Sequence, residues 1–464
     1  MNFPKLSCRK SLLLSLFLLL TSCAKESEKP ANGVIAVVNG VSITKREMVR
    51  RIELTPVPGF HRHKDRSKRV LDMLIDEITL SQWAKAQGFE DSPEYKEAIK
   101  FIEQQAMIRE LFFTEIRSNA VPDSQKIDLA LRKSMLRLTV QTMVTENKEI
   151  ADKWRKRMDS GKTFKDLTED YKGDPAIKIK DLSLHWGDGS VPIQVENVAY
   201  QTAVGESSDV IKLANAYAVL YVEHIAQDVF LTPYAVNMKQ LQIKEVLRAR
   251  KETVLANEYV SRLMKPLSVE QMGDGLEEVV KFIKKRVELN ENNGFPLAQI
   301  MNEELTLSDD FDLSLPVIKT PDFVWTGNDV TVLLRNYNYP IDKSSSASLR
   351  KTMTEFLKST VTDYYLAARA GQNGLQSAER VTEDVHIWSR YFLSFIGLSA
   401  FSDSDSILND KEAIVRHVKA LREKAAIEIN HDFLESIKLT GIPMVTVWKN
   451  RFNKHLAAPP LVKY

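Results

Sequence analysis

Cysteine is nearly absent from this chain of 464 residues, which contains only Cys8 and Cys23. So few cysteines leave the stability of the fold to core burial rather than to disulfides. Glycine is also scarce, with 17 residues, and together with 27% charged residues this favours a helix-rich protein. A net charge of +2 gives no reason to expect a nucleic-acid partner. No segment after Cys23 is apolar for long enough to cross a bilayer.

The N-terminus has the features of an export signal. Basic residues precede a leucine-rich run of about ten residues that ends at Leu20, which is too short to span a membrane. The sequence Leu-Thr-Ser-Cys that ends at Cys23 resembles the lipobox of lipoprotein signal peptides. We therefore predict a signal peptide over residues 1–22, lipidation of Cys23 and a polar tether over 23–33. The alternative is an ordinary signal peptide with a chance cysteine at its cleavage point.

A short hairpin and three amphipathic helices are predicted next. The β-branched run at 34–38 ends at Asn39-Gly40, which is typical of a strand followed by a tight turn. Thr44 is suited to cap a helix that ends near residue 54. Two longer helices, over about 66–87 and from 92 onward, have wide apolar faces that need partners.

Two stretches of this region carry a family resemblance. "VIAVVNGVSITKREMVRRI" and "LDMLIDEITLSQWAKAQGF" resemble the N-terminal chaperone lobe of the SurA/PrsA/PpiD envelope foldases, over about residues 34–117. We predict a SurA-like chaperone lobe over 34–133. The resemblance implies a protein that holds unfolded exported chains in apolar grooves and needs no nucleotide.

The following region resembles a parvulin prolyl isomerase domain. "MDSGKTFKDLTEDY", "KDLSLHWG", "AVGESSDVI" and "AYAVLYVEHI" occur in the order of the parvulin helix turn, Gly-Asp-Leu-Gly loop, later turn and last strand. We predict a parvulin-like domain over 134–226. The fold class is therefore α+β: mostly helical SurA-like lobes with an inserted parvulin-like α/β domain.

The residues that parvulins use for catalysis are replaced in this sequence. The resemblance implies two facing histidines, but Thr142 and Ala218 occupy those positions, and only Asp174 matches a family position that is often Cys or Asp. No catalytic residue is assigned. The family's apolar clamp corresponds to two valines, and the candidates for the substrate groove are Val191, Val195, Met143 and Tyr217. Little or no isomerase activity is expected, since an enzyme must favour the twisted amide over a barrier of about 20 kcal/mol.

Three other motifs are weaker than they look. Gly161-Lys162-Thr163 resembles the end of a P-loop, but a helix rather than a strand precedes it, so no nucleotide is predicted. His61-x-His63 has no nearby third ligand, and no metal or other cofactor is predicted. His185, beside Trp186, fits neither parvulin histidine position and is interpreted as a packed or surface residue.

The rest of the chain is predicted to be mainly helical. Residues 227–320 should form a helical segment that packs on the chaperone lobe, with helices over 231–264 and 273–289 and a linker or extended segment over 308–321. A turn is expected near residues 290–296, before a short helix near 297.

Residues 321–464 form a C-terminal helical region and a candidate second SurA-like lobe. Ala370-x-x-x-Gly374 matches Ala84-x-x-x-Gly88, and nearby apolar positions keep step. Chance similarity of two helical hairpins is the alternative. The final predicted elements are a helix over 410–437, a strand over 444–448 that pairs beside residues 34–38, and a loose tail.

The sequence thus predicts a lipid-anchored, ATP-independent chaperone of the cell envelope. Its partners would be unfolded or nascent exported proteins, with outer-membrane proteins as one candidate class, and the bilayer through Cys23. Ala24 and Lys25 lack the aspartate that retains enterobacterial lipoproteins inside, which favours the outer membrane in a cell that has two. The alternatives are an active parvulin isomerase and an envelope scaffold with one folded partner.

Overall fold

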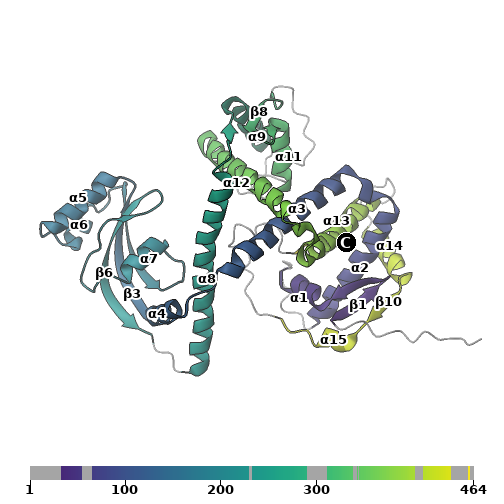
Figure 1. Ribbon diagram of the computed structural model, residues 1–464, viewed down its shortest axis with the longest axis horizontal. Helices are drawn as coiled ribbons and strands as arrows, with labels where there is room; N and C mark the ends of the chain where they lie inside the picture. The colour runs from purple at the N-terminus through teal and green to yellow at the C-terminus, as the bar shows by residue number, and fades with distance from the viewer. Residues whose placement is uncertain are drawn as a thin grey trace, which may run out of the picture. The chain divides into compact units, whose positions relative to one another are not determined.

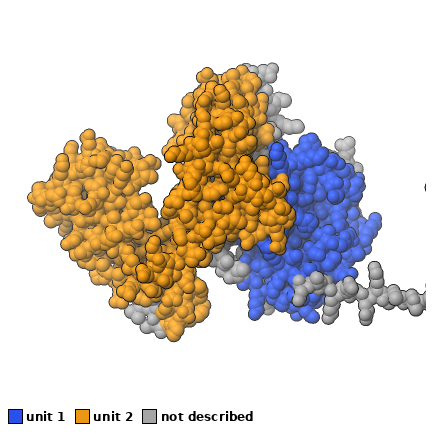
Figure 2. Space-filling view, in the orientation of Figure 1, with its two compact units in different colours: residues 1–102, 383–464 blue, residues 103–382 orange. Residues whose placement is uncertain are grey.

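A computed structural model describes residues 33–54, 65–228, 232–289, 311–337, 342, 344–402, 411–439 and 458–459. Two compact units result: unit 1 combines Met1–Ile102 with Glu383–Tyr464, and unit 2 is Glu103–Thr382 (Figure 2). Helices dominate and the sheets are small, which confirms the predicted α+β class. The predicted signal peptide, Cys23 and nearly all of the tether lie outside the described residues. Among the helices that are described, none is long and apolar enough to cross a membrane.

Unit 1 begins with the predicted hairpin and helices (Figure 1). Asn39 and Gly40 both have positive φ, 47° and 82°, as the two-residue turn between β1 and β2 requires. Gly88, with φ 85°, follows the C-cap residue Gln87 of the second helix, where a left-handed glycine commonly ends a helix. The elements are β1 (Val34–Val38), β2 (Val41–Thr44), α1 (Lys45–Leu54), α2 (Arg66–Ala86), η2 (Phe89–Asp91) and α3 (Pro93–Glu115).

The C-terminal part of unit 1 differs from the prediction. The helix expected over 410–437 is wrong: α14 (Lys411–Glu423) ends early, β10 (Ile427–Ile429) follows, and α15 (His431–Glu435) comes last. β10 pairs antiparallel with β1 in the sheet order β10-β1-β2. Both edges of β1 are therefore occupied by described strands, β10 and β2. Residues 444–448 themselves lie outside the described residues.

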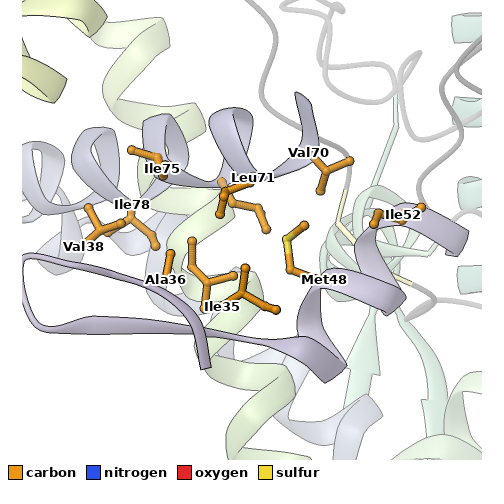
Figure 3. Packing of buried hydrophobic residues seen from close by; sticks show 11 residues of the cluster. Ile35, Ala36, Val38, Met48, Ile52, Val70, Leu71, Ile75 and Ile78 are labelled. Carbon is orange, nitrogen blue, oxygen red and sulfur yellow. The ribbon is translucent and has the colours of Figure 1, made fainter. Parts of the chain in front are cut away.

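The core of unit 1 lies between this sheet and helices α1 and α2. Figure 3 shows side chains of β1 and α1 directed toward those of α2. All are at most 2% exposed. The cluster comprises Ile35, Ala36, Val38, Ile43, Met48, Ile52, Val70, Leu71, Leu74, Ile75 and Ile78. Each of the larger side chains contributes about 1.5–3 kcal/mol by its burial.

A partly buried histidine is expected to make unit 1 sensitive to acid. The ring of His417 stacks on Phe401 at 4.1 Å and meets Trp83 edge-on at 4.7 Å. Its Nε2 is buried without a hydrogen-bond partner among the described residues. Burial lowers the pKa of His417 below its usual value, because it disfavours the charged imidazolium.

Stability should therefore be complete above the unfolded pKa, about 6.5, and should fall as the pH drops through the folded pKa. We expect the midpoint of thermal unfolding to fall from pH 7 to pH 5, and to fall less in His417→Phe, which keeps the ring contacts. Circular dichroism melts at both pH values measure this. Equal falls in the two proteins would contradict the assignment.

Unit 2 contains a four-stranded antiparallel sheet of order β4-β3-β6-β5. Its helices follow the predicted pattern: Asn147 caps α5, and Thr163 begins α6 in a capping box with Asp166. Gly161-Lys162-Thr163 thus joins two helices. The elements are α4 (Ser124–Ser134), β3 (Leu136–Thr145), α5 (Lys148–Asp159), α6 (Phe164–Asp170), β4 (Ile177–His185), α7 (Ile193–Ala199), β5 (Ile211–Lys212) and β6 (Tyr217–Gln227).

A second hairpin and a set of helices complete unit 2. Of the two alternatives for 308–321, a linker or an extended segment, the described part contains an extended one: Val317 and Ile318 are buried in β8, in a sheet of order β7-β8-β9. The turn and helix expected near 290–297 lie outside the described residues. The elements are α8 (Pro233–Met264), β7 (Glu270–Gln271), α9 (Gly273–Leu289), β8 (Pro316–Lys319), β9 (Val324–Thr326), α11 (Gly327–Asn336), α12 (Ser346–Gln372), η4 (Leu375–Ser377) and α13 (Glu379–Ser402), which continues into unit 1.

Candidate functional site

The four-stranded sheet of unit 2 is covered on both faces. On one face, Leu138 and Val140 of β3 pack with Val195 and Ala199 of α7. On the other, Met143 packs with residues of α5 and α6. The two sets alternate along β3, because successive side chains of a strand point to opposite faces. We call these the α7 face and the α5 face.

Thr142 and Ala218 both lie on the α7 face. Thr142 is 4% exposed, and its Oγ1 donates a hydrogen bond to the carbonyl of Lys180 at 3.2 Å. Ala218 is 1% exposed and packs in the same apolar cluster as Val195. The hydroxyl of Thr142 is thus hydrogen-bonded to the backbone, and the methyl group of Ala218 is part of the core. Neither side chain offers an acid or a base to a twisted amide.

The four groove candidates are not brought together. Val191 and Val195 pack on the α7 face, whereas Met143 and Tyr217 pack on the α5 face. The sheet itself separates the two pairs. The reason is strand alternation: Met143 and Tyr217 are each one residue removed from the positions that were aligned with the histidines.

Asp174 and His185 have structural surroundings. Asp174 lies in the turn before β4, where its Oδ1 accepts a hydrogen bond from the backbone N–H of Ala176 at 2.9 Å. His185 ends β4 with 42% of its side chain exposed, and its Nε2 is 3.7 Å from a carboxylate oxygen of Asp228. The interpretation of His185 as a packed or surface residue is confirmed. Within the described part of the chain, no three His, Cys, Asp or Glu residues gather as a metal site would require.

Sequence reasoning missed a buried ion pair that attaches this sheet to α8. Glu196 of α7, with a side chain 3% exposed, accepts hydrogen bonds from Arg250 of α8 at 2.7 Å and from the Gly187 N–H at 2.8 Å. The guanidinium of Arg250 also lies over the ring of Trp186, 4.6 Å from its centroid. The only signal in the sequence was Glu196, an acidic residue between the apolar residues Val195 and Val198 of this short helix.

A half-buried tyrosine lies close to this contact. The Tyr200 hydroxyl donates to the carbonyl of Leu136 at 2.9 Å, and burial raises its pKa to about 12. The phenol is therefore neutral at physiological pH and serves as a donor. Tyr200 also packs with Trp186 and Ile243, so it contributes to the same attachment.

Helix α8 has an exposed apolar stripe on the side away from this attachment. Tyr234, Met238 and Leu241 follow one another at i, i+4 and i+7, and they are 73%, 49% and 55% exposed. Ile243, which is 1% exposed, packs on Ala130 and Trp186 from the opposite face of the helix. We call Tyr234, Met238 and Leu241 the α8 stripe. Three large apolar side chains in a row on a long helix are a typical surface for binding another chain.

The large aromatic residues Trp83, Tyr95 and Phe101 of α2 and α3 are not freely exposed to a client. Trp83 packs against Phe401 and His417, and the Tyr95 hydroxyl lies 2.5 Å from the hydroxyl of Ser389. Phe101 is also partly buried. The α8 stripe is therefore a better candidate than these three.

The chain is similar in sequence to curated PrsA foldases. It is 24% identical over 280 residues to foldase protein PrsA of Geobacillus kaustophilus, covering 56% of this chain and 93% of that protein. It is 22% identical over 241 residues to foldase protein PrsA of Geobacillus sp. (strain WCH70), covering 46% of this chain and 82% of that protein. No protein-family model matches.

Among solved structures, the chain is similar to PrsA of Bacillus anthracis, with 16% identity and a TM-score of 0.22. That match covers 47% of this chain and 95% of the other. It is also similar to a structure from work on the SurA-like chaperones PEB4 and Cj1289 of Campylobacter jejuni, with 16% identity and a TM-score of 0.21. That match covers 52% of this chain and 100% of the other. Such TM-scores add nothing to the sequence matches. The chain resembles SurA/PrsA-type foldases, as its sequence predicted.

Proposed function

We propose that this protein is a lipid-anchored, ATP-independent chaperone or foldase of the cell envelope that binds unfolded exported proteins. The α8 stripe carries the proposal, because it presents apolar side chains to solvent on a helix whose opposite face is fixed to a folded domain. An unfolded chain can cover such a stripe without a defined sequence. The similarity to PrsA foldases supports the same class.

We further propose that the parvulin-like domain supports the chaperone and has little or no isomerase activity. The α7 face is filled by apolar side chains, and Thr142 donates to backbone. Anchoring through Cys23, which the export signal suggests, would hold the α8 stripe at a membrane surface of the cell envelope, the outer membrane in a cell that has two. A scaffold with one folded partner would need no general apolar surface.

The test is suppression of aggregation of a chemically unfolded exported protein. The variant Tyr234→Ser, Met238→Ser, Leu241→Ser should lose most of the suppression, while Asn237→Ser, Gln242→Ser, Lys244→Ser, at exposed polar positions of the same helix, should keep it. Cis/trans isomerisation of a proline peptide should not be accelerated. Equal suppression by both variants would remove the α8 stripe as the client surface, and no suppression by the wild type would favour the scaffold.

A further inference from the structure

The same order of elements occurs twice in the chain. A hairpin, a ten-residue helix, a long helix, a single 3-10 turn and a third helix form β1-β2-α1-α2-η2-α3 and again β8-β9-α11-α12-η4-α13. Thr44 and Thr326 end the two hairpins, and the hydroxyl of each accepts a hydrogen bond from the N–H three residues on. Gly88 and Gly374 precede the 3-10 turns with φ 85° and 73°.

Burial keeps the same register in the two copies. Counted from Thr44 and Thr326, Met48 matches Val330 and Ile52 matches Leu334, and all four are at most 1% exposed. Counted from Gly88 and Gly374, further buried residues coincide on the long helices. These pairs are Val70 with Phe356, Leu71 with Leu357, Ile75 with Val361, Leu80 with Leu366 and Ala84 with Ala370.

The third helix of the second copy, α13, is part of unit 1 from Glu383 onward. There Arg390 is paired with Glu47 of α1 and lies 3.7 Å from Glu77 of α2. Further along α13, a Cβ on Gly397 would lie 2.7 Å from the Cβ of Ala84. The helix of the second copy thus packs on α1 and α2 of the first.

The third helix of the first copy, α3, is part of unit 2 from Glu103 onward. Gln105 donates to the hydroxyl of Tyr337, directly after α11, at 3.3 Å. Glu110 is 3.3 Å from Arg380, and Arg380 lies over the ring of Phe113. The helix of the first copy therefore packs among elements of the second.

We propose that the chain is an internal duplication in which each copy gives its third helix to the lobe of the other. The lobe of the first copy, β1-β2-α1-α2, is completed by α13, and the lobe of the second, β8-β9-α11-α12, is completed by α3. The arrangement corresponds to two exchanged protomers joined in one chain.

Charge complementarity explains why each lobe accepts the helix of the other copy. In the first lobe, Arg390 offsets two buried carboxylates that face a single buried arginine, Arg51. The residue of α3 that matches Arg390 is Gln104. Docking α3 there would separate Glu47 and Glu77 from Arg390, and Arg50 from Asp384, because Gln104 and Ala98 hold the matching places. Losing both sets of buried ionic contacts disfavours the unexchanged arrangement.

The second lobe has no arginine at the matching positions and uses hydrogen bonds of a tyrosine hydroxyl instead. Leu333 stands where the first lobe has Arg51, and the hydroxyl of Tyr337 bonds Gln105 and Asp363, the match of Glu77. Helix α3 suits this lobe because its Gln105 donates a hydrogen bond to the Tyr337 hydroxyl. Different contacts in two otherwise similar lobes are what specific pairing requires.

Engineered cysteine pairs test the exchange in the full chain, with Cys8→Ser and Cys23→Ser removing both native thiols. The exchanged pairs are Ala84→Cys with Gly397→Cys, and Ala370→Cys with Leu111→Cys, which holds the matching place. The unexchanged pairs are Ala84→Cys with Leu111→Cys, and Ala370→Cys with Gly397→Cys. Disulfides need Cβ atoms about 3.5–4.5 Å apart, so a small outward shift of α13 suffices for the first pair.

Both exchanged pairs are expected to form disulfides within one chain, identified by peptide mass mapping, and the unexchanged pairs are not. Disulfides in the unexchanged pairs, or exchanged disulfides only between two chains, would overturn the proposal. If core cysteines prevent folding, Arg50→Cys with Asp384→Cys, joined by a short bismaleimide, replaces the first pair, since Arg50 and Asp384 are ion-paired. Its unexchanged control is Arg50→Cys with Ala98→Cys, and cross-linking of that control would overturn the proposal equally.

Discussion

Replacing Arg390 by methionine should lower the free energy of unfolding of unit 1 by about 3–5 kcal/mol. The side chain of Arg390 is 6% exposed, and those of Glu47, Glu77 and Arg51 are 3%, 0% and 0% exposed. Removing Arg390 leaves the carboxylates of Glu47 and Glu77 facing only the guanidinium of Arg51, with all three groups away from water. The cost is that of an uncompensated buried charge, which exceeds the value of the contact itself.

The control for this prediction is Arg416→Met in the same unit. Arg416 is paired with Glu412 at 3.6 Å, but their side chains are 66% and 89% exposed, so its loss should change stability by at most about 1 kcal/mol. The neutral variant Glu47→Gln, Arg51→Met, Glu77→Gln, Arg390→Met should recover most of the loss, because all four charges of the cluster are removed while Arg50 and Asp384 keep each other as partners. Urea unfolding followed by circular dichroism measures all three. A loss below about 1 kcal/mol in Arg390→Met would show that water solvates the cluster.

Local signals in the sequence predicted the helices and the first hairpin. Asn39-Gly40 favours the positive φ values of a tight turn, Thr44 caps a helix and Gly88 ends one, and each acts over a few residues. The caps of α5 and α6, Asn147 and Thr163, are local signals of the same kind.

Long-range pairing could not be predicted in the same way. Ile427 to Ile429 reads as a continuation of α14, and only the free edge of β1, far away in the chain, makes it a strand. Likewise, Glu47 and Arg390 are isolated charges in amphipathic helices until the fold brings them together across 343 residues. Such choices depend on tertiary context, which overrides local propensity.

Thr142 and Ala218, which the resemblance aligned with the two facing histidines, lie in neighbouring strands, where the structure pairs Thr142 with Leu220 and Ala218 with Val144. Met143 and Tyr217 were not separated from the valines, because a resemblance gives neighbours in sequence without giving the face of each side chain. The α8 stripe was missed since exposure cannot be read from an apolar residue alone.

The second large effect is expected at Trp154, the centre of the α5 face. Its side chain is fully buried, it meets the ring of Tyr171 at 6.0 Å, and its indole N–H has no hydrogen-bond partner among the described residues. Trp154→Ala should destabilise the parvulin-like domain by about 3–5 kcal/mol through the cavity it leaves. Trp154→Phe should cost less than about 1.5 kcal/mol, because it keeps an aromatic ring and removes the unpaired donor. Exposed Lys153→Ala is the control, with a change within about 0.5 kcal/mol.

Thermal unfolding and urea titration of these variants measure how far the domain depends on its own core. Equal losses of stability in Trp154→Ala and Trp154→Phe would contradict the cavity argument.

The same variants also test whether client binding depends on this domain. Tyr234, Met238 and Leu241 lie on the side of α8 opposite Ile243, which packs on the domain. Trp154→Ala should therefore still suppress aggregation below its melting temperature, since the α8 stripe needs the helix and not the sheet. If Trp154→Ala lost suppression while folded, the client surface would have to include the parvulin-like domain.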